Sequence, residues 1–411
     1  MPSFSTNIEV IIIPRATKQA ISFRNVKSFS TYSTWKTLED TAEVVLLKAE
    51  EVIAKKISPG DLISISCGYE PRLDLEFVGY ITEVSPNYPF KLTCMDKMWF
   101  LDQFKYQFPY NTASENDGNT SCKVQSITLK SLIEDIVTVK DEKGNVLIKD
   151  NILFDEEYPW DHIFLRDYRI ENMSRKEALA KLKKDFCLTF YYNFDKQLYA
   201  GFAYGEYIKD TAKRKNKDTL ENFPKQGITV DNVVSKGEFK MDLANSCTPD
   251  TNIYQKNLNA NNVGVYMSSY NKYLPDQQHH NVVVGAQNPS DKIIEKKTYH
   301  VIGDSIDIIE NVLIDLGAEC LSHERYEGLG GSITSWGWPL IRHSKIMEIK
   351  FDNKKELEGR YFVESVETKL SASSGYRRVI TLGRKASAPK VQELKATSQR
   401  YSSEIAKLVN G

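Results

Sequence analysis

Two stretches rich in strand-forming residues lie near opposite ends of the chain and limit what it can fold into. The first, Gly60 to Asp102, reads as one short β-strand after another, with Gly79 inside a strongly apolar strand. The second, Glu356 to Gly383, has the same character. Short strands separated by polar turns are typical of antiparallel barrels and sandwiches. The sequence therefore predicts a mainly β protein with two small antiparallel β-barrels.

Length and charge exclude several functional classes. A chain of 411 residues has room for about two to four domains. Its 54 Lys and Arg nearly balance its 55 Asp and Glu, for a formal net charge of −1, so no specific nucleic-acid partner is expected. No apolar run reaches the roughly 18 residues of a membrane span, and the N-terminus lacks the basic start of a signal peptide. We therefore expect synthesis in the cytoplasm, and we expect no membrane insertion.

Cysteine and histidine positions predict neither a metal centre nor a cofactor. The six histidines form no metal-binding motif, and no phosphate-binding loop or nucleophile elbow is present. The cysteines show no C-x-x-C or Cys/His spacing. We therefore expect isolated, mostly buried thiols rather than a zinc site or disulfide framework at Cys67, Cys94, Cys122, Cys187, Cys247 and Cys320.

The first barrel is expected over residues 1–110. Runs of β-branched and aromatic residues alternate there with turn-forming pairs such as Pro59–Gly60. The expected strands are Asn7–Ile13, Ala42–Leu47, Asp61–Cys67, Leu73–Val84 and Phe90–Met95.

An α+β domain with helices and a hairpin is expected over residues 111–225, because the apolar period changes there from two to about 3.6 residues. Thr128 is a candidate N-cap for a first helix. Ser174 and Glu177 form an S-x-x-E capping box before a second helix. The strands that follow turn at Asn193–Lys196, as in a β-hairpin.

The second barrel is expected from residues 226–245 and 332–388, with an inserted α+β segment at 246–331. The first part of the insertion is expected to be irregular or mixed, and a long helix follows a cap at Asp304 or Ser305. Residues 389–411 have a heptad-like apolar spacing that predicts a C-terminal docking helix. Its candidate partner-docking residues are Leu394, Tyr401, Ile405 and Leu408.

The sequence also contains residues typical of two other kinds of site, a glycosidase active site and a glycan-binding surface. The acidic run Asp155–Glu157 lies close to Trp160 and Asp161 and resembles the paired carboxylates of a glycosidase. In a chain with 55 acidic residues such neighbours arise by chance, so no enzyme is expected. The aromatic insertion suggests a glycan- or receptor-binding surface as the alternative function, with Tyr254, Tyr266, Tyr270 and Tyr273 as its contacts.

Short motifs in both β-rich stretches resemble the baseplate hub proteins of contractile phage tails and related injection systems, the late control protein D family, and the N-terminal part of secretion-system spike proteins. The first family barrel has a G-D strand opening and an F-x-G-x-I-x-x-V strand, and the last has G-R-Y-x-V-x-x-V before a polar turn. The matching residues are Gly60, Asp61, Phe77, Gly79, Ile81, Val84, Gly359, Arg360, Tyr361, Val363 and Val366, with Gly375 in the turn.

This resemblance implies a structural role. It implies two tube-like barrels per chain and a homotrimeric, pseudo-sixfold ring that joins the tail tube to the central spike. The implied partners are a spike protein, a tail tube protein and baseplate wedge or tape measure components. The chain would be made in the host cytoplasm and assembled into a virion tail or injection-apparatus baseplate. Only 28 residues follow Gly383, so we expect a separate spike protein to complete the tip.

Overall fold

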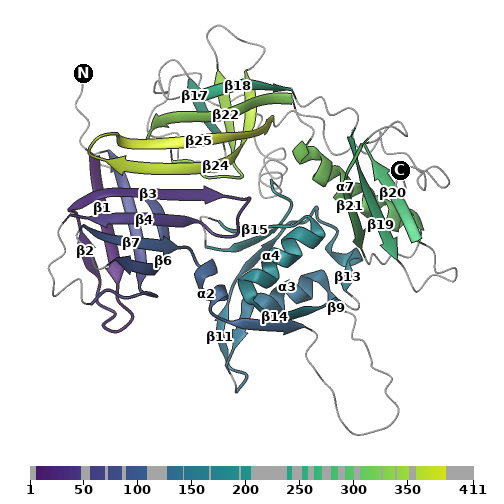
Figure 1. Cartoon of the computed structure of the whole chain (residues 1–411), viewed down its shortest axis with the longest axis horizontal. Helices are drawn as coiled ribbons and strands as arrows, with labels where there is room; N and C mark the ends of the chain where they lie inside the picture. Colours follow the sequence, from purple (N-terminus) through teal and green to yellow (C-terminus); the bar gives the residue numbers. More distant parts are fainter. Residues whose placement is uncertain are drawn as a thin grey trace, which may run out of the picture.

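The computed structural model of the chain is mainly β, with α+β insertions (Figure 1). The expected fold class is therefore confirmed. Strands from near both ends of the chain join in one 13-stranded sheet. None of the helices placed by the structure is long and apolar enough to cross a membrane. The structure describes residues 6–47, 56–69, 73–85, 89–108, 127–141, 143–165, 168–193, 196–204, 238–242, 252–257, 263–270, 279–285, 292–299, 306–324, 327–337, 340–350 and 358–385.

The first β-region surrounds a single apolar core. Its strands alternate inward apolar and outward polar residues, which is the period of a half-buried strand, and the inward side chains of all seven strands meet in one cluster. The sheet order is β3-β4-β7-β6-β5-β1-β2. The strands are β1 (Thr6–Ile13), β2 (Ile21–Phe23), β3 (Val26–Thr34), β4 (Thr41–Leu46), β5 (Leu62–Tyr69), β6 (Asp74–Ser85) and β7 (Phe90–Met95).

The second β-region has its own apolar core, which includes Tyr361, Val363 and Ile380. Its strands pair in the order β18-β22-β25-β24-β23-β17. These strands are β17 (Glu238–Asp242), β18 (Asn252–Asn257), β22 (Glu327–Trp336), β23 (Ile346–Lys350), β24 (Gly359–Ser371) and β25 (Gly375–Lys385).

The two β-regions repeat one topology. If β17, β18 and β22–β25 are matched in chain order to β1 and β3–β7, the strand order in the sheet is the same. Four successive pairings are antiparallel in both copies. The fifth differs, because β1 runs antiparallel to β5 whereas β17 runs parallel to β23. The pairing of β24 with β3 joins the two copies edge to edge (Figure 1).

An α+β domain follows the first β-region, and the sequence predicted two of its helices, α3 (Leu129–Val137) and α4 (Arg175–Phe186). The Thr128 side chain accepts a hydrogen bond from the Ser131 amide, and both bonds of the Ser174–Glu177 capping box are formed. The elements are α2 (Met98–Asp102), β8 (Lys105–Phe108), β9 (Ile127–Thr128), α3 (Leu129–Val137), β10 (Thr138–Lys140), β11 (Val146–Lys149), β12 (Ile152–Phe154), η1 (Trp160–His162), β13 (Phe164–Leu165), β14 (Ile170–Ser174), α4 (Arg175–Phe186), β15 (Thr189–Tyr192) and β16 (Leu198–Gly201).

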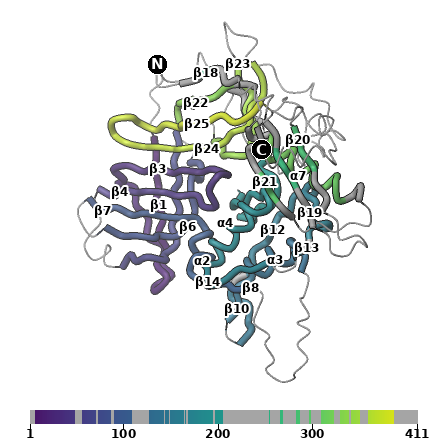
Figure 2. The backbone as a smooth tube through the Cα atoms, turned by 45° about the vertical axis from the view of Figure 1, so that its right-hand side comes forward, coloured from purple at the N-terminus to yellow at the C-terminus, as the bar shows by residue number. Residues whose placement is uncertain are grey.

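An inserted lobe separates β18 from β22. It consists of β19 (Val263–Tyr270), β20 (His279–Val284), β21 (Lys292–Tyr299) and α7 (Ile306–Glu324). The strands form a three-stranded sheet, whereas irregular or mixed structure was expected. The sequence of these strands has many polar residues and no clear alternation of apolar and polar positions, so it did not predict strands. The expected long helix is present as α7. The inserted lobe lies beside the α+β domain (Figure 1 and Figure 2) and shares one apolar core with it.

One prediction about the cysteines is wrong. Cys187, at the end of α4, and Cys320, in α7, form a disulfide although 133 residues separate them in sequence. Spacing along the chain does not reveal such a pair, because only the packing of the inserted lobe on the α+β domain brings the two sulfurs together. Cys67 and Cys94 are buried free thiols, as expected. Cys122 and Cys247 lie outside the described residues.

Candidate functional site at the seam between the two β-regions

The seam is a strand pairing reinforced by side chains. Residues 365–371 of β24 pair with residues 34–28 of β3 in antiparallel register. The buried hydroxyl of Thr34 donates a hydrogen bond of 3.0 Å to the Glu364 carbonyl. Nearby, the Lys36 ammonium lies 2.6 Å from the Glu364 carboxylate. The two β-regions are therefore continuous in both backbone and side-chain contacts.

A buried ion pair crosses from one β-region to the other. The Arg378 guanidinium of β25 donates from Nη2 to Oε1 of Glu76 in β6 at 2.7 Å, and the two side chains are 1% and 2% exposed. Arg378 also donates to the backbone carbonyls of Gly337, at 2.9 Å, and Ile341, at 3.3 Å. Burial is the largest single influence and disfavours the charged guanidinium, but the charge of Glu76 and the interactions with Tyr376, together with the hydrogen bonds to both side chains, raise the pKa of Arg378.

Tyr376 places an aromatic ring of the second β-region in the core of the first. Its ring centroid lies 5.5 Å from that of Tyr69 and 6.4 Å from that of Phe29. Its hydroxyl donates a 2.5 Å hydrogen bond to Oε1 of Glu76. Burial raises the pKa of Tyr376, so the phenol stays protonated. Because residues at i and i+2 share a face of a strand, Tyr376 and Arg378 reach the same carboxylate.

Sequence reasoning missed this cluster, and the cause is a β-bulge. The β5–β6 register shifts between Ile65 and Ser66, so Glu76 has no direct partner in β5. Two consecutive residues, Glu76 and Phe77, are therefore buried, while Leu75 is 45% exposed. The only signal in the sequence was Arg378, which is a charged residue at an inward position between Tyr376 and Ile380.

The Gly60–Asp61 motif organises the entry into β5. Gly60 has a φ of +90°, in the region that favours glycine. The buried Asp61 carboxylate accepts hydrogen bonds from the backbone amides of Arg15 and Ser58, both at 2.8 Å. Gly60 and Asp61 thus fix the turn that leads into β5, and the Asp61 carboxylate is used in hydrogen bonds to the backbone.

The x-x spacing before the last valine of each strand motif coincides with a β-bulge. In β6 the register with β7 shifts between Ile81 and Glu83, and Val84 packs against the core. In β24 the register with β25 shifts between Val363 and Ser365, and Val366 is buried. An extra residue restores the valine to the inward face in both strands. The two motifs therefore have the same backbone irregularity at the same place.

The remaining motif residues lie along β24 and at the start of β25. Tyr361 is buried, which raises its pKa to about 12. Arg360 stands opposite Glu348 of β23 in the register. Gly359 begins β24, and Gly375, with a φ of +67°, begins β25 after the polar turn. The candidate docking residues Leu394, Tyr401, Ile405 and Leu408 lie outside the described residues.

A second buried polar cluster lies where the two β-regions meet the α+β domain. Asp96 Oδ2 accepts a hydrogen bond from the Asp40 amide at 3.1 Å, and Arg342 lies 3.5 Å from Asp40. Burial raises the pKa of Asp40, and it raises the pKa of Asp96 well above its usual value, with repulsion from Asp40 adding to the effect. Burial and Arg342 lower the pKa of His343, which stays neutral. A cavity of about 230 Å³ adjoins the two carboxyl groups.

Asp155, one of the carboxylates considered for a glycosidase, serves other contacts. The fully buried Asp155 accepts hydrogen bonds from the Tyr199 hydroxyl and from the Phe202 and Glu157 amides. The Trp160 indole is buried and donates to the Asp155 carbonyl at 2.5 Å. These residues line an open hollow of about 650 Å³ beside α7. Within the part of the chain that is described, no group of three His, Cys, Asp or Glu residues is suited to a metal ion.

The tyrosines of the alternative glycan-binding hypothesis are not gathered on one sheet. Tyr254 is 54% exposed on β18, in the large sheet, whereas Tyr266 lies on β19, in the inserted lobe. The Tyr270 side chain and the whole of Tyr273 lie outside the part of the chain that the structure describes. The structure therefore gives no specific support to a glycan surface.

The fold of this chain is similar to that of two proteins of phage tails and of a chain in a VgrG complex. A tail protein from Neisseria meningitidis MC58 matches with a TM-score of 0.53 and 11% sequence identity, over 92% of this chain and 97% of that one. The 43 kDa tail protein of prophage MuSo2 from Shewanella oneidensis matches with a TM-score of 0.52 and 10% identity, over 94% and 100%. A chain of a PdpA–VgrG complex matches with a TM-score of 0.50 and 8% identity, over 95% and 66%.

At such low identity these likenesses show the fold alone. No protein-family model matches the sequence, and no curated protein matches it. The resemblance to baseplate hub and spike-related proteins that the motifs predicted is confirmed at the level of the fold.

Proposed function

We propose that the chain is a structural baseplate hub protein that forms a trimeric, pseudo-sixfold ring between the tail tube and the central spike of a contractile phage tail or injection system. The observation that carries the proposal is the repeat of one six-strand order in the two β-regions. Three copies of a chain with two such regions supply six similar units, which suits a sixfold tube on one side and a threefold spike on the other.

The contact between neighbouring copies follows from the contact within one copy. In the chain, β24 pairs with β3. By the repeat, β6 corresponds to β24 and β18 corresponds to β3. The strand β18 lies at one end of the large sheet. In β6, the residues from Glu83 onward follow the bulge. They correspond to the residues of β24 that pair with β3. Pairing of β18 in one copy with this end of β6 in the next would close a head-to-tail ring and cover the open edge.

The other parts of the chain receive roles consistent with this ring. We assign β1–β7 to the first tube-like barrel, β17, β18 and β22–β25 to the second, α2–β16 to the α+β domain and residues 258–326 to the insertion. These bounds differ from those expected from the sequence, because the strand pairing includes β18 and β22 in the second barrel. Residues 389–411, with Leu394, Tyr401, Ile405 and Leu408, would dock on the spike, the tube or a sister chain. Wedge or tape measure components would complete the baseplate. The role is mechanical, and assembly would follow synthesis in the host cytoplasm.

The test combines the native mass with a site-specific cross-link. Light scattering on the chain co-expressed with its spike protein is expected to give three hub copies per complex. A photo-reactive amino acid in place of Tyr254, which is exposed on β18, is expected to cross-link to residues near Glu83 of another copy, as read by mass spectrometry.

The matched control places the same photo-reactive group at Tyr32. This residue is exposed on β3 and stands opposite Glu367 of β24, so its cross-link should fall within one chain. Cross-links from position 254 that stay within the chain, or a complex with one or two hub copies, would refute the proposed ring.

A further inference from the structure

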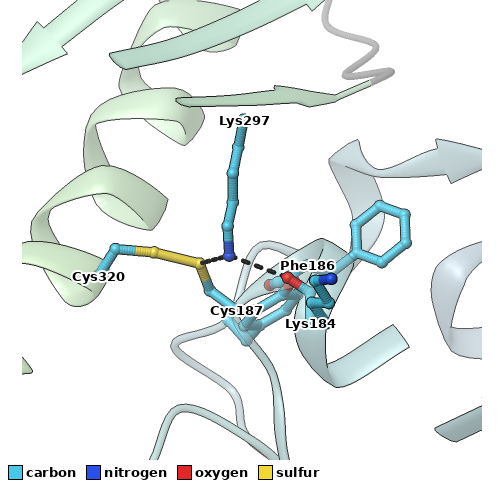
Figure 3. The surroundings of a disulfide bond; sticks show 6 residues. Lys184, Phe186, Cys187, Lys297 and Cys320 are labelled. Carbon is cyan, nitrogen blue, oxygen red and sulfur yellow. Dashed lines mark hydrogen bonds between the residues drawn. A yellow bond between two sulfur atoms is a disulfide. The ribbon is translucent and has the colours of Figure 1, made fainter. Parts of the chain in front are cut away.

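The Cys187–Cys320 disulfide joins two parts of the molecule that are far apart in sequence. Cys187 ends α4 in the left-handed conformation of a C-cap, and Cys320 lies in the last turns of α7. Both side chains are partly exposed. Figure 3 shows the bond reaching from α7 to the end of α4. Neither residue of the bond is fully buried, in contrast to the buried thiols of Cys67 and Cys94.

A lysine from the inserted lobe reaches the same sulfur. The ammonium of Lys297, on β21, lies 3.0 Å from Cys187 Sγ and donates a hydrogen bond of 2.9 Å to the Lys184 carbonyl (Figure 3). A positive charge at this distance stabilises a thiolate. When the disulfide is open, Cys187 is therefore the sulfur that carries negative charge and attacks another disulfide.

The bond and the lysine together fasten the inserted lobe to the α+β domain. The apolar core that the two parts share holds them in contact in either redox state. The disulfide adds a covalent restraint between residues 133 apart in sequence, and closing so long a loop lowers the entropy of the unfolded chain. It also ties α7 to the end of α4, so the two cannot separate there while the bond is closed.

We propose that Cys187, Cys320 and Lys297 form a redox latch that is open in a reducing compartment and closed in an oxidising one. To close it, the Cys187 thiolate attacks a small disulfide such as oxidised glutathione and releases one glutathione thiolate. The Cys320 thiolate then attacks Cys187 Sγ in the mixed disulfide and releases the second. Two protein thiols are oxidised, one glutathione disulfide is reduced to two thiols, and the two protons pass to solvent or to the leaving thiolates.

The timing of closure rests on the proposed function. Thiols stay reduced in the cytoplasm where the chain would be made, so the inserted lobe would be held only by its apolar core during assembly. Closure after release would then fix it. The chemistry of the latch itself does not require a ring, and its test uses the purified full-length chain, so the two proposals fail independently.

The first test follows the latch in glutathione buffers. Peptide mapping after alkylation is expected to show Cys187 linked to Cys320 in oxidised glutathione, and both residues alkylated in a buffer poised like the cytoplasm. On opening, amide hydrogen exchange of α7 should rise about tenfold or more, with no change in β4 and β7. A disulfide that persists in the reducing buffer would be a permanent structural bond and would overturn the proposal, as would unchanged exchange in α7.

The second test addresses the lysine. In the reduced protein, Lys297→Met is expected to slow iodoacetamide labelling of Cys187 about tenfold, which corresponds to a change of one unit in the thiol pKa. Labelling of Cys320 should not change. Lys296→Met is the matched control, because Lys296 is an exposed neighbour on the same strand. Equal labelling rates for Cys187 in the two variants would remove Lys297 from the latch.

Discussion

Arg378 is among the largest fully buried side chains in the described part of the protein, and burying its charge has a large free-energy cost. Removing a guanidinium and a carboxylate from water costs several kcal/mol each, and their attraction offsets this only when further hydrogen bonds are made. Here the two backbone carbonyls and the Tyr376 hydroxyl supply those bonds. The cluster therefore restricts how the two β-regions can be placed more than it adds net stability.

We expect the single variants Glu76→Gln and Arg378→Met each to destabilise the protein by about 3–5 kcal/mol, because each leaves a buried partner without its counter-charge. The double variant should cost less than the sum of the two. Guanidinium unfolding of the four proteins of this double-mutant cycle measures the coupling. Arg377→Met is the control, since Arg377 lies over the exposed Trp336 ring on the other face of β25. If each single variant were destabilised by less than about 1 kcal/mol, the ion pair would not be the restraint that we describe.

At the scale of secondary-structure elements, the approach of β6 to β7 depends on Gly79. A Cβ at this position would lie 2.2 Å from the backbone carbonyl oxygen of Met95, in β7, and 2.6 Å from the Phe77 ring. A backbone atom cannot move aside without opening the strand pair.

Gly79→Ala is therefore expected to cost about 3 kcal/mol or more, at the upper end of overpacking effects. The control is Thr82→Ala on the same strand, which loses one hydrogen bond to the Thr93 carbonyl and should cost about 1 kcal/mol. Thermal unfolding of both variants against the wild type makes the comparison. A Gly79→Ala protein as stable as the Thr82→Ala protein would contradict the close approach.

Elements with a strong local signal could be predicted from the sequence, and those defined by tertiary contacts could not. The Ser174–Glu177 capping box predicted the start of α4, because both of its hydrogen bonds are local. Strand β3 was missed because its sequence, VKSFSTYST, is mostly polar, and the partners it needs, β4 and β24, lie elsewhere in the chain. In β6 the bulge buries Glu76 beside Phe77 and leaves Leu75 exposed, an arrangement that simple period-two alternation does not give. No local pattern indicated the Cys187–Cys320 pair.

At the scale of the whole molecule, Asp96 lies where three parts meet. Asp40 and Asp96 belong to the first β-region, Tyr192 belongs to the α+β domain, and Arg342 lies in the loop before β23. The pKa of Asp96 is raised well above its usual value by burial and by Asp40. The unfolded chain loses this proton at lower pH than the folded chain does, so folding stability falls as the pH rises between the two pKa values.

Asp96→Asn cannot ionise and is expected to gain stability relative to the wild type as the pH rises from about 4 to about 8. The lowered pKa of His343 destabilises both proteins alike at low pH, so it cancels in the difference. Thermal midpoints of the two proteins across this range provide the measurement. Asp161→Asn, at an exposed site, is the matched control for the loss of a carboxyl group. A constant difference for Asp96→Asn would show that Asp96 is ionised in the folded protein.

The inserted lobe gives the two β-regions unequal neighbours. Between β3 and β4 the chain needs only residues 35–40, whereas between the corresponding strands β18 and β22 it runs through residues 258–326. In a ring of three copies, a partner that contacts only the shared strand pattern would meet six nearly equivalent positions. A partner that contacts the lobe would meet three, spaced by a third of a turn. One polypeptide would thus present two different rotational periodicities to two different binding partners.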